Sequence, residues 1–417
     1  MARIAVIGTS LAGLACAHFL HRAHALTVFP QDGYTGGGPD AEPGDEPGLT
    51  FERATSPHLA RLLDRLQVPL GAIPASFSIR DDTNGLEWRS HAALGHLFAQ
   101  RRNLVNARFV RLLRVVRRFH REAPGLLDEP ETAGQTLGDY VRRHGYGDDF
   151  FHTYLLPLSC ALWTTTPEFM LSFPVAPLLR FFREHGLLQL RTTRSWSAVT
   201  GGATAYRERL TAPWRDRLRP AEQATRVVRT PHGATVMTDR GVAQSFEHVI
   251  LATRADHALR LLVNPTPDET RLLGEFEYQR VTLTRHTDSS VMPRTRRAWA
   301  PWNCQLHRDA EGRLACATHR WLNPASPGAD GTPAFVSINA STPIAPASVI
   351  RSTTREQPVF TLGTARAQTE LFELNTRARG RTETYFCGHY FGCNSPEDEL
   401  RSAVQLAALL LDRDPWG

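Results

Sequence analysis

Short, mostly apolar runs recur along the chain, and each is bounded by polar or glycine residues. The runs are Ile4–Ile7, Leu26–Phe29, Val249–Ala252 and Thr384–Cys387. A strand buried on both faces of a parallel sheet has this continuous pattern, whereas a strand with one face in water alternates apolar and polar residues. The pattern therefore predicts buried parallel strands drawn from both ends of the chain and from its middle.

A glycine-containing turn and a helix-like stretch join the first two runs. The turn reads Gly-Thr-Ser-Leu-Ala-Gly from Gly8 to Gly13. A strand, a glycine turn, a helix and a second strand within about thirty residues are the start of a Rossmann unit. Gly8 permits the tight turn, Gly13 permits close packing of helix and strand, and the helix N-terminus offers N–H groups to a diphosphate. The residues expected to contact a dinucleotide here are Gly8, Ser10, Leu11, Ala12 and Gly13.

Two residues of this unit depart from the usual dinucleotide pattern. Ser10 stands at the middle glycine position, where a side chain narrows the approach to the phosphates. Pro30 ends the second strand, where an acidic residue would hold the ribose hydroxyls, and the loss of one such bond costs about 1.5–3 kcal/mol. We expect weaker dinucleotide binding, and a Rossmann-shaped unit that binds no nucleotide stays open.

The turn also matches the Gly-x-Ser-x-Ala form of a nucleophile elbow. In α/β-hydrolases that elbow follows several strands, whereas here a single predicted strand precedes Ser10. The pattern therefore favours the Rossmann interpretation over a hydrolase.

Three further patterns predict local structure. Arg226–Thr230 and Ala234–Thr238, separated by a Pro-His-Gly sequence, predict a hairpin. Ser395, followed by proline and two acidic residues, predicts the N-cap of a final helix. Arg101–Arg121 predicts a basic amphipathic helix, either a solvated face or a surface for anionic lipid or an acyl carrier.

Composition indicates an ordinary globular protein. Of the 417 residues, 41% are hydrophobic and 22% charged, and no apolar run approaches the ~18 residues that span a bilayer. His18 and Arg22 interrupt the apolar N-terminus, which argues against a signal peptide. The six cysteines are scattered without a Cys-x-x-Cys pair, which predicts neither a disulfide framework nor a zinc site and fits a cytoplasmic location.

The basic residues exclude several chemistries. All 48 are arginine, so the chain has no Schiff-base lysine and no P-loop lysine. A net charge of +6 would suit nucleic acid, but the arginines are dispersed and no reader motif is present. His18, His21 and His24 lack acidic or thiol partners nearby, so no metal site is predicted.

Several segments resemble one family over nearly the whole chain. The chain is similar to bacterial NAD/FAD-binding proteins of the flavin amine-oxidoreductase superfamily, the group often encoded beside cyclopropane-fatty-acid synthases. The segments that carry the resemblance are 97–103 (LFAQRRN), 154–157 (YLLP), 163–165 (WTT), 180–182 (RFF), 185–188 (HGLL), Trp196 with 199–202 (VTGG), 249–253 (VILAT), 297–300 (RAWA) and 385–388 (YFCG).

This resemblance implies an α/β fold with a discontinuous Rossmann-type FAD-binding domain and a mixed helical and β-sheet substrate domain. The first would comprise residues 1–50, 196–260 and 376–417, and the second 51–195, expected to be largely helical, and 261–375. The implied function is an FAD-dependent oxidoreductase acting on a hydrophobic, acyl or polyketide-like small molecule, free or carrier-bound. The alternative is a redox-neutral isomerase or cyclase on a scaffold that has weakened or lost FAD.

The resemblance also implies further site residues. Those expected to contact the cofactor are Gly37, Gly38, Thr225, Ala252, Gly388, Glu397 and Asp398. His389, His185 and Tyr390 are the candidate catalytic groups, because they titrate or donate protons inside family-like segments. The aromatic residues between Tyr154 and Trp196 predict either a core or the lining of a substrate pocket.

Overall fold

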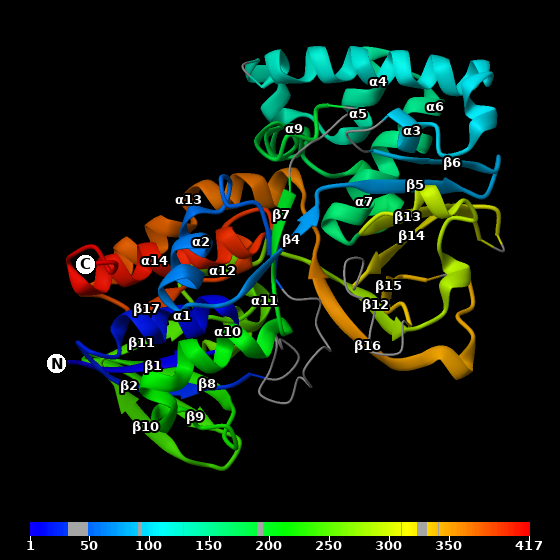
Figure 1. Ribbon diagram of the computed structural model, residues 1–417. Coiled ribbons are helices and arrows are strands. Elements are labelled where there is room, and N and C mark those ends of the chain that lie inside the picture. The colour runs from blue at the N-terminus through cyan, green and yellow to red at the C-terminus, as the bar shows by residue number, and fades with distance from the viewer. Residues whose placement is uncertain are drawn as a thin grey trace. The chain divides into compact units, whose positions relative to one another are not determined.

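The computed structural model describes residues 1–31, 49–90, 94–127, 129–189, 195–309, 311–322, 332–340 and 342–417. The predicted cofactor contacts Gly37 and Gly38 lie outside these ranges. The chain forms two compact units (Figure 1). Unit 1 comprises Met1–Gly71, Ala198–Glu277 and Gly363–Gly417, and unit 2 comprises Ala72–Ser197 and Tyr278–Leu362. The chain passes between them within β4 (Leu70–Pro74) and β7 (Ser195–Val199), and again after Glu277 and after Leu362.

A four-stranded parallel sheet forms the centre of unit 1. Its order is β17 (Thr384–Phe386), β11 (His248–Leu251), β1 (Arg3–Ile7) and β2 (Ala25–Phe29). The central strand is fully buried from Ile4 to Ile7, as its continuous apolar pattern predicts. All four predicted strands are therefore confirmed.

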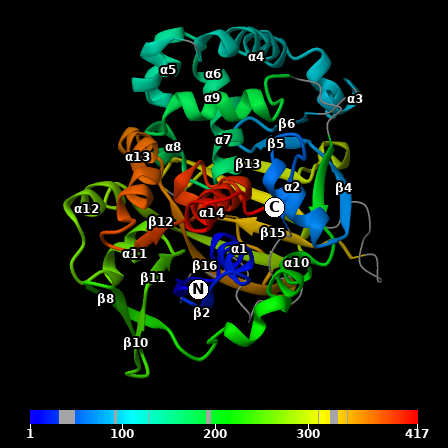
Figure 2. The same ribbon diagram turned by 90° about the vertical axis from the view of Figure 1, so that its left-hand side faces the viewer.

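Helices cover one face of this sheet. Every second strand residue points to that face, so its apolar side chains are buried against the helices. Ile4, Val6 and Ile250 share a hydrophobic cluster with helix residues. The helices of this cluster are α1 (Leu11–Leu20), α2 (Pro57–Arg65), α10 (Gly202–Thr211) and α14 (Pro396–Leu411). Figures 1 and 2 show α1 beside α14, which it contacts closely.

The rest of unit 1 consists of a hairpin with a third strand and of further helices and turns. The predicted hairpin is confirmed as β8 (Ala224–Thr230) and β9 (Gly233–Thr238), and β10 (Ala243–Phe246) adds a third strand. The other elements are β3 (Thr50–Phe51), η4 (Ala212–Arg217), α11 (Ala255–Leu261), α12 (Pro267–Leu273), α13 (Leu362–Ala378) and η8 (His389–Phe391).

Unit 2 contains a seven-stranded sheet in which only β5 and β13 are paired in parallel. In spatial order the strands are β16 (Val349–Pro358), β12 (Tyr278–His286), β15 (Phe335–Ile338), β14 (Leu314–Trp321), β13 (Trp302–Arg308), β5 (Phe77–Asp81) and β6 (Leu86–Arg89).

Helices lie over one face of this sheet (Figure 1). They are α3 (Leu94–Leu97), η1 (Arg101–Leu104), α4 (Ala107–Leu126), η2 (Pro130–Gly134), α5 (Leu137–His144), α6 (Asp148–Phe150), η3 (Phe151–Leu155), α7 (Leu156–Trp163), α8 (Pro167–Leu171) and α9 (Val175–Glu184). The segment between β12 and β13 carries two short turns, η5 (Ser289–Val291) and η6 (Arg296–Ala298), and η7 (Pro346–Ser348) precedes β16.

Residues 51–195 are largely helical, as expected, except that residues 70 to 89 form strands, and one expected helix start needs correction. Asp81 organises a tight turn between β5 and β6. Its carboxylate accepts hydrogen bonds from the Thr83 N–H (2.9 Å) and the Asn84 amide (2.6 Å). The basic helix begins at Ala107 rather than at residue 101, because Asn106 caps it and the preceding residues form the separate turn η1.

No helix in the described part of the chain has both the length and the apolar composition needed to cross a membrane.

Candidate functional site

The predicted phosphate-binding turn lies at the carboxyl end of β1 and has the geometry that its glycines imply. Gly8 has φ +114°, and a Cβ there would lie 2.3 Å from the carbonyl oxygen of Ala252. At Gly13, a Cβ would lie 2.1 Å from the Gly8 carbonyl oxygen. Real Cβ contacts are never this short, so both positions require glycine. Ala252, which directly follows β11, is therefore in contact with the turn.

Ser10 is the N-cap of α1 rather than an obstacle on the phosphate side of the turn. Its Oγ accepts a hydrogen bond from the Gly13 N–H at 3.4 Å and donates one to the Ala252 carbonyl at 3.2 Å. The side chain is buried, with 1% of its surface exposed. The first N–H groups of a helix have no acceptor within the helix, and the serine side chain accepts a hydrogen bond from one of them. A glycine at this position would provide no such acceptor.

The first two residues of α1 are Leu11 and Ala12, and the backbone N–H of Ala12 already donates a hydrogen bond within the protein. Glu399 Oε1 accepts a hydrogen bond from the Ala12 N–H at 3.1 Å. Glu399 belongs to α14 and is buried. Reasoning from the sequence missed this residue. The signal available was its place directly after Glu397 and Asp398 in the first turn of a strongly capped helix.

Glu397, predicted to face a cofactor, instead holds the start of α2. Its carboxylate accepts hydrogen bonds from the backbone N–H groups of His58 (3.1 Å) and Leu59 (2.8 Å). The N-cap of α2, Ser56, makes no side-chain bond of its own. Burial raises the pKa of Glu397, although these two bonds act in the opposite direction.

Asp398 caps its own helix. It forms a reciprocal capping box with Ser395, which confirms the predicted helix start, and also accepts a hydrogen bond from the Cys393 N–H at 2.9 Å. Gly392 leaves room for this carboxylate, because a Cβ there would lie 2.2 Å from Asp398 Cγ. The acidic residues at 397, 398 and 399 thus stabilise the starts of three different helices.

Gly388 and the two residues after it follow the parallel strand β17. Gly388 has φ +149°, and its N–H donates to Ser402 Oγ at 3.0 Å. His389 and Tyr390 are both buried, with their rings in an edge-on contact. Burial lowers the pKa of His389 to about 4, helped by the nearby Arg254, so its imidazole is neutral at pH 7.

The remaining predicted site residues lie elsewhere. His185 belongs to unit 2, where it ends α9, stacks on Phe181 and shares a 3.0 Å hydrogen bond with the Phe181 carbonyl through Nδ1. Thr225 is an exposed residue of β8, and its hydroxyl donates to the Met237 carbonyl at 3.1 Å. Neither residue contacts the glycine turn through a described hydrogen bond.

The aromatic residues of unit 2 form a core for the most part. Tyr154, Trp163, Phe173 and Phe182 are buried in the cluster between the helices and the sheet. An apolar pocket lined partly by Trp196 and Trp302 has a volume of about 10 Å³, which is about the space of one water molecule. The sequence allowed either a core or a pocket lining for these aromatic residues, and these four form part of the core.

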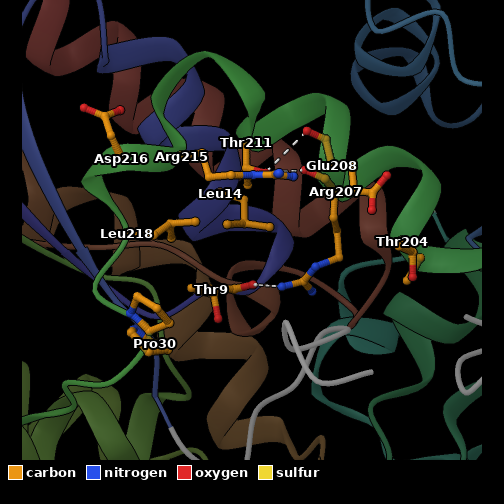
Figure 3. A pocket seen from close by; sticks show the side chains of 12 residues that line it. Thr9, Leu14, Pro30, Thr204, Arg207, Glu208, Thr211, Arg215, Asp216 and Leu218 are labelled. Carbon is orange, nitrogen blue, oxygen red and sulfur yellow. Dashed lines mark hydrogen bonds between the residues drawn. The ribbon is translucent and has the colours of Figure 1, made fainter. Parts of the chain in front are cut away.

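A much larger cavity, of about 530 Å³, adjoins the glycine turn within unit 1 (Figure 3). Thr9 and Pro30 line it at the carboxyl ends of β1 and β2, where Rossmann-type sheets bind their ligands. Arg207 extends from α10 to the turn, and its Nη2 donates to the Thr9 carbonyl at 3.4 Å. The other lining residues are Leu14, Ala203, Thr204, Glu208, Thr211, Arg215, Asp216, Leu218 and Pro220.

Sequence reasoning did not identify α10 or η4 as part of a site, although Gly201 and Gly202 at the start of α10 carried the family resemblance. His389 and Tyr390 do not line this cavity.

These features fit the dinucleotide part of FAD. Gly8 and Gly13 let the turn and α1 pack closely against the chain's own backbone, which holds the start of α1 at the carboxyl end of β1, where Rossmann-type sheets receive a diphosphate. The adjoining cavity offers both apolar and arginine side chains to a nucleoside. The side chain of Pro30 cannot accept a hydrogen bond from a ribose hydroxyl, and the Ala12 N–H already donates to Glu399. The residues of this site therefore fit the dinucleotide part of FAD, but they offer fewer hydrogen bonds to it than the usual Rossmann motif does.

Comparison with known proteins agrees with this architecture. No protein-family model matches the chain, and no curated protein matches it. Among solved structures, cyclohexylamine oxidase from Brevibacterium oxydans IH-35A has a TM-score of 0.68 at 14% identity, covering 98% of this chain and 99% of that one. Wild-type putrescine oxidase bound to putrescine has a TM-score of 0.66 at 12% identity, covering 99% of each chain.

A third similar structure is the CLA-producing fatty acid isomerase from P. acnes. Its TM-score is 0.67 at 14% identity, with 99% of this chain and 98% of that chain covered. These likenesses show the fold, and the expected α/β class with a Rossmann-type parallel sheet is confirmed.

Proposed function

We propose that this chain is an FAD-dependent oxidoreductase that acts on a hydrophobic, acyl or polyketide-like small molecule. The observation that carries the proposal is the glycine turn at the carboxyl end of β1, which adjoins a cavity of about 530 Å³. The fold shared with two amine oxidases supports it. In this proposal unit 1 binds the nucleotide, unit 2 binds the substrate, free or carrier-bound, and the protein works in the cytoplasm.

The residues of unit 1 would hold the cofactor in a defined way. The backbone from Gly8 to Gly13 would receive the diphosphate, and the cavity beside Pro30 and Arg207 would receive the adenosine half. Ser10 would hold the first turn of α1 in place through its hydrogen bond to the Ala252 carbonyl. Bound FAD supplies a two-electron acceptor for a hydride from the substrate.

His389 is buried and lies outside the lining of the cavity, and it is the proposed proton acceptor. Its imidazole is neutral at pH 7 and so has a ring nitrogen that can accept a proton, although the same burial lowers its pKa to about 4 and makes it a weak base. Tyr390, in edge-on contact with His389, would hold the ring in position. His185 is retained as a second candidate for proton transfer in unit 2.

Titration of the apoprotein with FAD, followed by flavin fluorescence, tests the proposal. Saturable binding is expected. Thr204→Trp should weaken it, because an indole at this position fills the cavity beside the turn. Ser245→Trp, on the exposed strand β10 outside the cavity, is the matched control and should bind like wild type. Absence of saturable binding to the wild-type protein would contradict the proposed function.

One observation favours a second candidate, a redox-neutral isomerase or cyclase. Glu399 occupies an N–H group that a diphosphate would use, as expected of a scaffold that has lost its dinucleotide. The fatty acid isomerase of similar fold makes this alternative concrete. Such an enzyme would work by shape, orientation and acid–base groups. Product with the same oxidation state as the substrate, formed without added FAD, would support it over the first proposal.

A further inference from the structure

Glu399 is the one carboxylate that the described structure places on the first turn of α1. The N-terminus of an α-helix carries N–H groups without helical partners and the positive end of the helix dipole, so it attracts anions. In Rossmann units this end of the first helix receives the diphosphate. Here the Ala12 N–H donates to Glu399 Oε1 at 3.1 Å.

The position of Glu399 follows from the way α14 begins. Ser395 and Asp398 form the capping box that fixes the first turn, and the Glu399 N–H donates to the Ser395 carbonyl at 3.1 Å. α14 packs along α1 (Figure 2), so the next residue after the capping box lies against the start of α1. The side chain of Glu399 is 8% exposed. The contact is thus part of the packed interior of unit 1.

A diphosphate at this helix start would meet two costs. It would lose the Ala12 N–H, because that donor is engaged, and it would approach a buried carboxylate of the same charge sign. Like charges placed together in an interface cost several kcal/mol. FAD would therefore have to displace Glu399 or bind beside it.

We infer that Glu399 is an internal anion that competes with the diphosphate of a dinucleotide for the start of α1, so that this chain lowers its own affinity for FAD. The inference deepens the proposed function and rests on unit 1 being the nucleotide-binding unit. It names Glu399 as a residue that sets cofactor affinity, a role distinct from those of Ser10 and Pro30.

The test compares wild type with Glu399→Gln and Glu399→Ala, using FAD, ADP and riboflavin as probes. FAD and ADP carry a diphosphate, whereas riboflavin does not. Removing the charge should lower the Kd for FAD and for ADP by about tenfold or more, which corresponds to about 1.4 kcal/mol, and should leave the Kd for riboflavin unchanged. Glu373→Gln removes one charge from an exposed position of α13 and should match wild type.

Thermal unfolding of each variant tests whether it folds. If Glu399→Gln does not fold, the comparison uses Glu399→Ala. Equal Kd values for FAD in wild type and both variants would overturn the inference while leaving the proposed function in place. FAD binding by the variants but not by wild type would support the inference and contradict the proposed function. If none of the proteins binds FAD or ADP, the inference is wrong, because no diphosphate site exists.

Discussion

Glu397 and Leu59 are 338 positions apart in the sequence and are joined by a hydrogen bond of 2.8 Å from the Leu59 N–H to Glu397 Oε2. The bond replaces a side-chain cap that Ser56 does not provide, and it ties the first turn of α14 to the first turn of α2. Within unit 1, a single buried carboxylate thus connects two helix starts.

Replacing this carboxylate should destabilise unit 1. Glu397→Ala removes the acceptor from two backbone N–H groups, and the loss of a helix cap costs about 0.5–2 kcal/mol. Glu397→Gln should cost less, since its amide oxygen can still accept one bond. Thermal unfolding measures both, with the exposed Glu275→Ala as control. Equal melting temperatures for Glu397→Ala and Glu275→Ala would show that the cap contributes nothing.

Restoring the usual dinucleotide residues should tighten FAD binding. Pro30→Glu places a ribose acceptor at the end of β2, on the wall of the cavity, and one bond to a charged group contributes about 1.5–3 kcal/mol. Ser10→Gly restores the usual motif residue and costs a few tenths of a kcal/mol as a cap, so the gain is expected mainly from Pro30→Glu. The double variant should therefore lower the Kd for FAD by about tenfold or more, measured by flavin fluorescence. An unchanged Kd would leave Glu399 as the main cause of weak binding.

His389→Gln separates a chemical role from a packing role. If the imidazole accepts a proton, turnover should fall by about 10²–10⁴ while the melting temperature changes little. His389 is 3% exposed and contacts Tyr390, so a packing residue would give the opposite pattern. Both quantities should be measured on one preparation. A lower melting temperature with unchanged turnover per folded molecule would remove His389 from the site.

A buried polar chain in the sheet of unit 2 predicts acid sensitivity. Ser337 Oγ lies 2.7 Å from His286 Nε2 and 2.6 Å from His319 Nδ1, and His319 Nε2 lies 2.9 Å from Gln305 Oε1. Since Gln305 Oε1 only accepts, His319 carries its proton on Nε2 and accepts from the Ser337 hydroxyl. His286 then donates from Nε2 and accepts the Asp288 N–H at Nδ1. The arrangement satisfies both rings in their neutral form.

Burial lowers the pKa of His319 to about 3, whereas the unfolded chain has a histidine pKa of about 6.5. Below pH 6.5 the unfolded state takes up a proton that the folded state refuses. Stability should therefore fall as the pH drops from about 6.5 toward 3, by up to about 1.4 kcal/mol per pH unit for this group. Urea unfolding across this range measures the slope. His319→Gln should flatten it by about one proton, and an unchanged slope would contradict this origin.

The sequence was sufficient where neighbouring residues decide the structure. The continuous apolar runs at Ile4 and Val249 predicted buried parallel strands, the glycines at 8 and 13 predicted the tight turn, and Ser395 predicted a helix start. Each of these depends on local backbone geometry or on burial of a short segment, which residue type and spacing encode directly.

Only the tertiary structure decided the partners of the polar groups. Whether the Ala12 N–H is open to a diphosphate depends on Glu399, which is 387 positions away, and the role of Glu397 depends on α2. The family resemblance implied that Glu397 and Asp398 contact a cofactor, but an acidic helix start can accept hydrogen bonds from several different donors. The packing of α14 along α1 selects among them, since a carboxylate pairs with the donor that folding brings within hydrogen-bond distance. Composition and spacing carry no information about that distance.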